Sequence, residues 1–207
     1  MKRFIFYALG ALALTGCHGG GKTASADTDT VMPANPADDS VAELPVAYLT
    51  KDSIGPVKIG MSINIVPMEA EGLYDKKLNG ATQDAVTLDF SLGGHPRFVA
   101  YDFGEGVIDV INLIGADVKV KTLKGDIGIG DPMAIVLDLP GVQAEWSGYD
   151  GSGMWYWTWE GLWFAPAQEN LSQGLSQRLY HSVQAPTIKD FENENVAIGF
   201  IGTGLPF

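Results

Sequence analysis

Apolar and polar side chains alternate along several short stretches of this chain, as they do in half-buried β-strands. Residues 85–92 read AVTLDFSL, and Val86, Leu88 and Phe90 fall on one face because successive side chains of a strand point to opposite sides. Glycine-containing turns separate the next stretches, so the strands are predicted to pair antiparallel in a meander. The further predicted strands are residues 97–103, 107–114, 117–123 and, late in the chain, 195–202.

Two glycine-rich stretches resemble each other and suggest an internal duplication. Residues 55–68 (GPVKIGMSINIVPM) and 125–138 (GDIGIGDPMAIVLD) share five identical positions. Asp131 and Pro132 suit the start of a short helix in the second stretch. Ser62 can cap a helix in the first, although Pro67 would interrupt it after about one turn. Chance similarity in a chain rich in glycine and isoleucine is the alternative.

These patterns together predict an α+β fold with two related halves, each a short helix followed by an antiparallel β-meander. The halves would span about residues 47–122 and 123–207. Leu171, Leu175 and Leu179 recur at intervals of four and predict a longer helix in the second half, weakened by Gly174.

The stretch MWYWTWEGLWF, residues 154–164, holds four of the five tryptophans. Glu160-Gly161 fits a two-residue hairpin turn, which would pair Trp157 with Phe164 and Thr158 with Trp163. One face is then uniformly apolar and is assigned to the core. The other mixes aromatic and polar groups, as a partner-binding patch does. The core face carries Trp155, Trp157, Trp159, Leu162 and Phe164; the candidate binding face carries Tyr156, Thr158, Glu160 and Trp163.

The first residues have the layout of a secretory signal peptide. Lys2 and Arg3 precede an apolar run of eleven residues, 4–14, which is too short to span a bilayer, for which ~20 are needed. Residues 14–17, Leu-Thr-Gly-Cys, resemble the lipobox of bacterial lipoproteins. That resemblance implies cleavage before Cys17 and its acylation, so that the acyl chains would anchor the protein to a lipid bilayer. An ordinary signal peptide with a chance cysteine is the alternative.

Composition divides the remainder into a tether and a folded domain. Residues 17–44 are small, polar and acidic and contain no aromatic side chain, so they are predicted to form a flexible tether. The tether would span ~30 Å. Residues 45–207 carry the apolar patterning of a domain, which the core alone must stabilise because Cys17 is the chain's only cysteine. The resemblance to bacterial lipoproteins also implies a location, because an aspartate after the acylated cysteine tends to retain such proteins in the inner membrane, and His18 at this position favours the outer membrane.

Net charge argues against one class of partner. The chain carries −12, and removal of residues 1–16 with Lys2 and Arg3 leaves −14. An acidic surface repels phosphate backbones, so nucleic-acid binding is not expected.

The stretches Ile59-Gly60-Met61 and Ile129-Gly130-Asp131 carry a resemblance to two families. They resemble the element before the helix in β-lactamase-inhibitor-protein-like and SmpA/OmlA-like envelope domains, and the chain also resembles stress-regulated outer-membrane lipoproteins with a late G-x-x-I-G element. The resemblance covers at most residues 50–145. It implies protein binding or envelope assembly rather than catalysis, and no functional residue of those families transfers to this chain.

Catalytic motifs are weak. His18, His95 and His181 lack metal-ligand spacing, no G-x-S-x-G occurs, and residues 125–132 lack the GK[ST] ending of a phosphate loop. Carboxylates cluster in turns and at residues 190–194, and a glycosidase or calcium site would need a pairing that the sequence does not specify.

We therefore expect a non-enzymatic envelope lipoprotein without metal or cofactor that binds a protein or another envelope component. Tyr156, Glu160 and Trp163 are its candidate binding residues. The alternative is a small glycan-binding protein or glycan-acting enzyme that uses the tryptophan hairpin.

Overall fold

The computed structural model describes residues 45–66, 74–81, 86–149, 152–169, 171–181 and 183–204. The predicted signal peptide, Cys17 and the tether lie outside the described residues. So do residues 67–73 and Asp150. The first predicted short helix, between Ser62 and Pro67, lies in the described residues as a turn in which the Ile65 and Val66 N–H groups donate to the Ser62 carbonyl oxygen.

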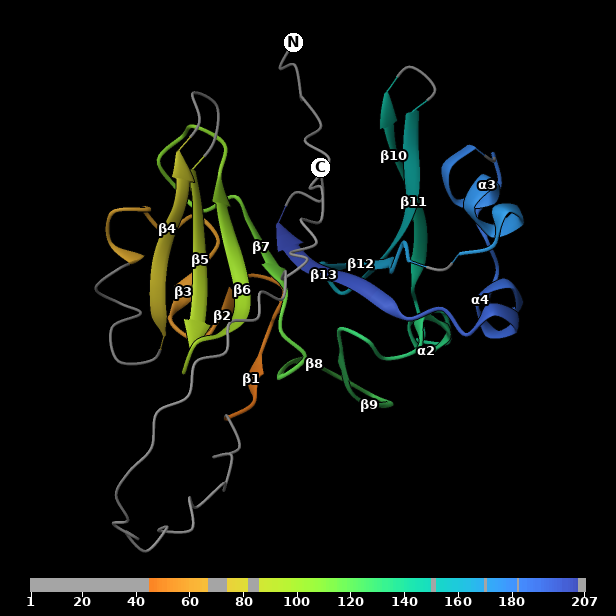
Figure 1. Ribbon diagram of the computed structural model, residues 1–207, viewed down its shortest axis with the longest axis horizontal. Helices are drawn as coiled ribbons and strands as arrows, with labels where there is room; N and C mark the ends of the chain where they lie inside the picture. The colour runs from red at the N-terminus through yellow and green to blue at the C-terminus, as the bar shows by residue number, and fades with distance from the viewer. Residues whose placement is uncertain are drawn as a thin grey trace, which may run out of the picture. The chain divides into compact units, whose positions relative to one another are not determined.

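One antiparallel sheet of eight strands dominates the domain (Figure 1). Two runs of sequential hairpins meet where the last strand of the chain pairs with the strand at residues 110–113, through Gly202 opposite Asn112 and Thr203 opposite Ile111. The strands, in spatial order, are β10 (Gln143–Tyr149), β11 (Ser152–Trp159), β12 (Leu162–Pro166), β13 (Ile198–Gly204), β7 (Val110–Leu113), β6 (His95–Asp102), β5 (Val86–Leu92) and β4 (Asp75–Ala81).

Five short strands form two smaller sheets. β1 (Ala47–Tyr48) pairs parallel with β8 (Val118–Thr122), which pairs antiparallel with β9 (Gly125–Gly128). β2 (Ser53–Ile54) and β3 (Val57–Lys58) form a hairpin. The strand predicted at residues 117–123 therefore exists as β8, but it leaves the main sheet instead of extending the meander.

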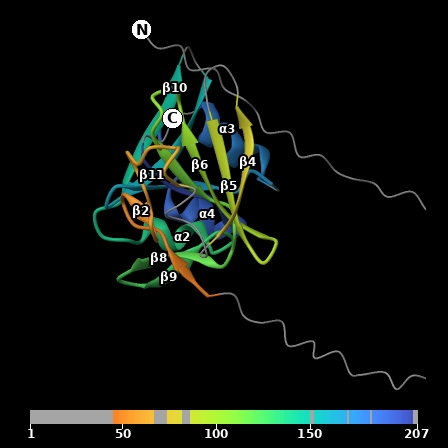
Figure 2. The ribbon, with the colours of Figure 1, turned by 90° about the vertical axis from the view of Figure 1, so that its left-hand side faces the viewer.

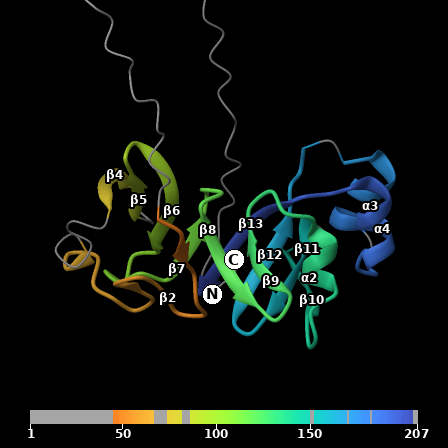
Figure 3. The same cartoon turned by 90° about the horizontal axis from the view of Figure 1, so that it is seen from below.

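Three short helices lie among the described residues: α2 (Met133–Leu137), α3 (Gln173–His181) and α4 (Ile188–Glu194). α2 confirms the short helix predicted after Asp131, and α3 confirms the leucine-based prediction, with Leu175 and Leu179 fully buried. Figure 3 shows α3 and α4 beside β11. The sequence interpretation missed α4, which begins with a capping box formed by Thr187 and Asp190.

The predicted α+β fold of two related helix-and-meander halves is wrong. The domain is mainly β, because its three described helices have only five, nine and seven residues, and eight strands form one continuous sheet. Moreover, α3 and α4 lie between β12 and β13, whereas no helix lies between β6 and β7. The first glycine-rich stretch contributes to the β2–β3 hairpin, and the second contributes β9 and α2, but a five-residue helix is too short to make a layer.

The main core lies on one face of the sheet. Phe90 and Phe98 stack at 4.3 Å between ring centroids, and Tyr74 packs edge-on against both. Val86, Leu88 and Phe90 lie on one side of β5 as predicted, with Leu88 and Phe90 buried and Val86 half-buried. At the other end of the same face, Trp157 packs edge-on against Phe191 of α4. This face therefore ties the helices and both runs of strands into one core.

A buried arginine connects the start of the domain to the sheet. Arg97 is 2% exposed, donates a hydrogen bond to the carbonyl oxygen of Pro45, and its Nε lies 2.9 Å from a carboxylate oxygen of Asp117. Its guanidinium also lies 5.8 Å from the ring centre of Tyr74. The backbone N–H groups of Ile114 and Gly115 donate to its carbonyl oxygen. Arg97 thus joins the first described residue, β6 and the connection from β7 to β8.

Figure 2 shows β8 and β9 near α2, and two ion pairs connect these elements. Lys119 Nζ lies 3.3 Å from Asp131, which also accepts the Gly128 N–H, and Lys124 pairs with Asp138. Asp131 therefore stabilises the turn before α2, although the residue that directly precedes the helix is Pro132.

Candidate functional site

The tryptophan-rich stretch forms the predicted hairpin. Trp157 pairs with Phe164, Thr158 with Trp163, and Trp159 with Leu162, which confirms the predicted register. Glu160 and Gly161 connect β11 to β12 with φ angles of 49° and 80°. Two consecutive positive φ angles are the geometry of the tight turns that match strand twist, and glycine at the second position makes this turn accessible.

The face assigned to the core is in the core. Trp157, Trp159, Leu162 and Phe164 are all buried, and Trp155 is half-buried. The indole N–H of Trp159 donates to the carbonyl oxygen of Pro140 at 3.2 Å, so its one polar group is satisfied.

The opposite face does not have the exposure that a binding platform requires. Tyr156 is 6% exposed and Trp163 is 2% exposed, whereas Glu160 in the turn is exposed. Tyr156 and Trp163 form a second hydrophobic cluster with Val110 and Ala165. This is a correction to the expected exposure of Tyr156 and Trp163; a partner role for the three candidate residues remains a prediction.

A glycine from a distant strand accommodates Trp163. Gly202 of β13 lies directly opposite Trp163, and a Cβ added to it would come within 2.3 Å of the indole. The sequence contains Gly202, but nothing local shows that it adjoins a tryptophan thirty-nine positions earlier.

A carboxylate organises the polar groups of this face. Glu145 of β10 accepts hydrogen bonds from the Tyr156 hydroxyl and the Thr158 hydroxyl, both at 2.8 Å. Burial, the hydrogen bond to Glu145 and its negative charge raise the pKa of Tyr156 to about 12. Tyr156 is therefore a neutral phenol that donates a hydrogen bond at neutral pH, and it is unsuited to act as a base or nucleophile.

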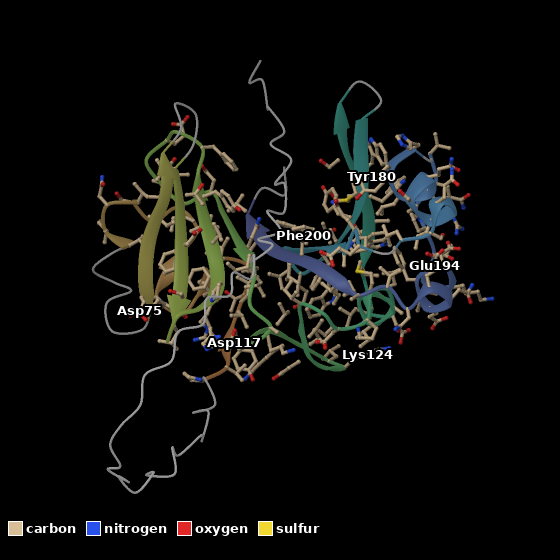
Figure 4. The ribbon with its side chains drawn as sticks, in the orientation of Figure 1. Asp75, Asp117, Lys124, Tyr180, Glu194 and Phe200 are labelled. Atoms are coloured by element: carbon tan, nitrogen blue, oxygen red, sulfur yellow. The ribbon has the colours of Figure 1, made fainter. Side chains whose placement is uncertain are left out.

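The same face continues across β13 and β7 with exposed apolar side chains. Phe200 lies opposite Ala165 in the sheet and is 42% exposed (Figure 4). Ile114, one residue beyond β7, is 46% exposed. Phe103, one residue beyond β6, is also 46% exposed and stacks on Tyr101. Sequence reasoning missed these residues as a group because only the pairing of β13 with β7 brings their strands together.

Tyr101 and Asn112 add polar groups to that surface. Burial raises the pKa of Tyr101, and the Asp89 carboxylate adds to this effect, while the Asn112 side chain hydrogen-bonds to the phenol and opposes it. The face therefore combines aromatic rings with a few amide, phenol and carboxylate groups.

Two further carboxylates, Asp102 and Asp190, have structural roles. Asp102 is 3% exposed and accepts backbone hydrogen bonds from residues 104, 105 and 106 at 2.8–3.0 Å, which holds the predicted turn. The Thr187 backbone N–H lowers the pKa of Asp190, and hydrogen bonds from the Thr187 and Arg178 side chains lower it further.

No metal centre emerges from the described ranges, where no three His, Cys, Asp or Glu side chains are grouped to hold an ion. His95 and His181 are both exposed, and His18 lies outside those ranges. None of the helices in the described part of the chain is long and apolar enough to cross a bilayer.

No protein-family model matches the chain, and no curated protein matches its sequence. One similar solved structure is that of the uncharacterized protein yfeY from Escherichia coli, which is 13% identical. The match covers 78% of this chain and 100% of that one, with a TM-score of 0.48.

Proposed function

We propose that the chain is an acylated lipoprotein of the bacterial outer membrane whose domain binds a protein or another envelope component without catalysing a reaction. The proposed anchor is Cys17, on the strength of the charged, apolar and Leu-Thr-Gly-Cys segments that precede the domain. Two or more acyl chains would hold the protein stably at a bilayer, because each buried methylene contributes ~0.8 kcal/mol.

The proposal that the domain binds a partner is supported by the exposure of Phe200 on β13 and of Ile114, which directly follows β7. Burial of such exposed apolar side chains against a partner would stabilise the complex by about 25 cal/mol per Å² of apolar surface removed from water. Aromatic side chains at the centre of a surface with a polar surround are typical of binding hot spots.

Photo-crosslinking in the intact envelope tests this role. A photoreactive phenylalanine analogue at Phe200 should capture a specific partner, whereas the same analogue at Leu123, which is 83% exposed on the β8–β9 turn, should not. Phe200→Ser should reduce co-purification of the captured partner at least tenfold, as loss of a hot-spot ring does, and Leu123→Ser should not. Equal capture from both positions would reject the surface around Phe200.

The alternative, a glycan-binding or glycan-acting protein built on the hairpin, has less support. Stacking on a sugar requires an open ring face, and Trp157, Trp159 and Trp163 are buried. Binding of an envelope glycan that is lost on substitution of hairpin residues, without loss of folding, would favour the alternative.

A further inference from the structure

The two edges of the main sheet differ in how they are protected against strand addition. β4 ends one side, and its sequence, DKKLNGA, contains two lysines and a register shift between Leu78 and Gly80. Lysines and bulges are devices by which proteins prevent an edge strand from pairing with another chain. This edge is therefore protected.

β10, at the other edge, has no lysine, proline or bulge, and its one charged side chain, Glu145, accepts hydrogen bonds from Tyr156 and Thr158 of the neighbouring strand β11. It pairs with β11 over seven consecutive positions without a register shift, and its sequence, QAEWSGY, contains neither lysine nor proline. Among the described residues its backbone bonds to no strand other than β11. In Figure 3 it lies outside β11, with no other labelled element beyond it. β10 thus presents a straight, seven-residue edge.

The side chains of β10 are suited to a copy of the same strand. Trp146 stands at the centre of the seven residues and is 38% exposed, with its ring edge-on to Trp155. Alternation puts Ala144 and Gly148 on the same face, one on each side of Trp146. These small neighbours leave room for a second indole.

We propose that β10 pairs antiparallel with β10 of a second copy of this chain, with Trp146 opposite Trp146 of the second copy. Only this register uses all seven residues of both strands. It puts Ala144 opposite Gly148 and the Glu145 carboxylate opposite the Ser147 hydroxyl, so the one charge on the strand directly faces no like charge. The two indoles meet across the two-fold axis, an arrangement that aromatic cross-strand pairs favour.

Two other features bear on the strength of this dimer. Each chain carries −12, so long-range repulsion opposes association and added salt should strengthen it by screening. If both copies are anchored to one bilayer, as the proposed function holds, their effective concentration rises and a modest affinity suffices. The edge pairing itself does not depend on the anchor.

Sedimentation of the full-length chain in mild detergent tests the pairing and its register. The wild-type protein should shift from monomer to dimer as its concentration rises through the micromolar range. Ser147→Glu places a carboxylate opposite Glu145 of the second copy, and the two-fold axis repeats this contact. The repulsion should raise the Kd of the dimer about fivefold. Ser147→Lys places a positive charge opposite Glu145 and should lower the Kd of the dimer by a similar factor.

Matched controls separate this contact from net charge. Val183→Glu and Val183→Lys make the same changes in charge at a site that is 99% exposed and away from β10, and both should leave the dimer Kd close to that of the wild type. Thermal melts of the four variants establish that each is folded.

A wild-type chain that remains monomeric throughout the micromolar range would overturn the proposal. So would a dimer that responds equally to Ser147→Glu and Ser147→Lys, because the register would then be wrong. If the chain is monomeric when pure but the β10 amides resist hydrogen exchange only in the envelope, another protein occupies this edge and the dimer is again refuted.

Discussion

Trp163→Ala should lower the free energy of unfolding by ~3–5 kcal/mol, as much as Trp157→Ala. Both indoles are almost fully buried, at 2% and 3% exposure, but on opposite faces of the sheet. Removing Trp163 empties the space between Ala165, Val110 and Gly202 that its ring fills. Denaturant unfolding of each variant, followed by far-UV circular dichroism, measures the loss.

Phe103→Ala is the control for a large aromatic ring at the surface. Its ring is 46% exposed, so the substitution removes little buried area and should cost clearly less than either tryptophan variant. If Trp163→Ala is no more damaging than Phe103→Ala, the second hydrophobic cluster does not contribute to stability as the structure indicates.

Arg97→Met should destabilise the domain by about 3 kcal/mol, the lower end of the loss for breaking a buried ion pair, because Arg97 is buried but the Asp117 side chain is 24% exposed. The substitution deprives the Pro45 carbonyl of its donor and leaves Asp117 without its cation. Arg97→Lys should recover only part of the loss. The lysine ammonium lacks the planar guanidinium group, which contacts the Pro45 carbonyl and the Asp117 carboxylate in different directions. Unfolding in urea measures both variants.

Arg178→Met provides the comparison with an exposed ion pair. Arg178 lies 2.5 Å from Asp190, but its side chain is 46% exposed, so the change should cost less than about 1 kcal/mol. Equal losses for Arg97→Met and Arg178→Met would show that Arg97 does not hold the start of the domain to the sheet.

Local patterns predicted the elements that depend on local chemistry. The alternation in residues 85–92 gave β5, and Glu160-Gly161 set the register of the β11–β12 hairpin, because a two-residue turn leaves no freedom in pairing. Asp131 and Pro132 located α2 to within a residue.

The arrangement of the sheet could not be predicted in the same way. β13 lies between β12 and β7, and the β7 partners of Gly202 and Thr203 are some ninety residues earlier in the chain. β4 was missed because DKKLNGA lacks apolar alternation, and β10 was missed because the alternation of Ala144 and Trp146 with polar residues covers only a few positions. The helix content of the two predicted halves was overestimated because glycine-rich hairpins and the starts of short helices contain the same types of residue.

The candidate site was predicted only in part, for a related reason. Alternation correctly separated Tyr156 and Trp163 from the core face, but it does not report what covers the other side of a strand. Val110 and Tyr101, which complete the second cluster, come from β7 and β6. The side chains of Tyr156 and Trp163 are therefore buried partly by residues of strands from the first part of the chain, which the sequence of the hairpin alone does not show.

Acylation of Cys17 is the most direct test of the proposed envelope lipoprotein. Metabolic labelling with a fatty acid, followed by intact mass measurement, should give a mature chain that begins at Cys17 and carries the added acyl groups. Cys17→Ser should remain unlabelled, uncleaved and no longer anchored by lipid. Equal labelling and unchanged membrane retention of Cys17→Ser would contradict the account.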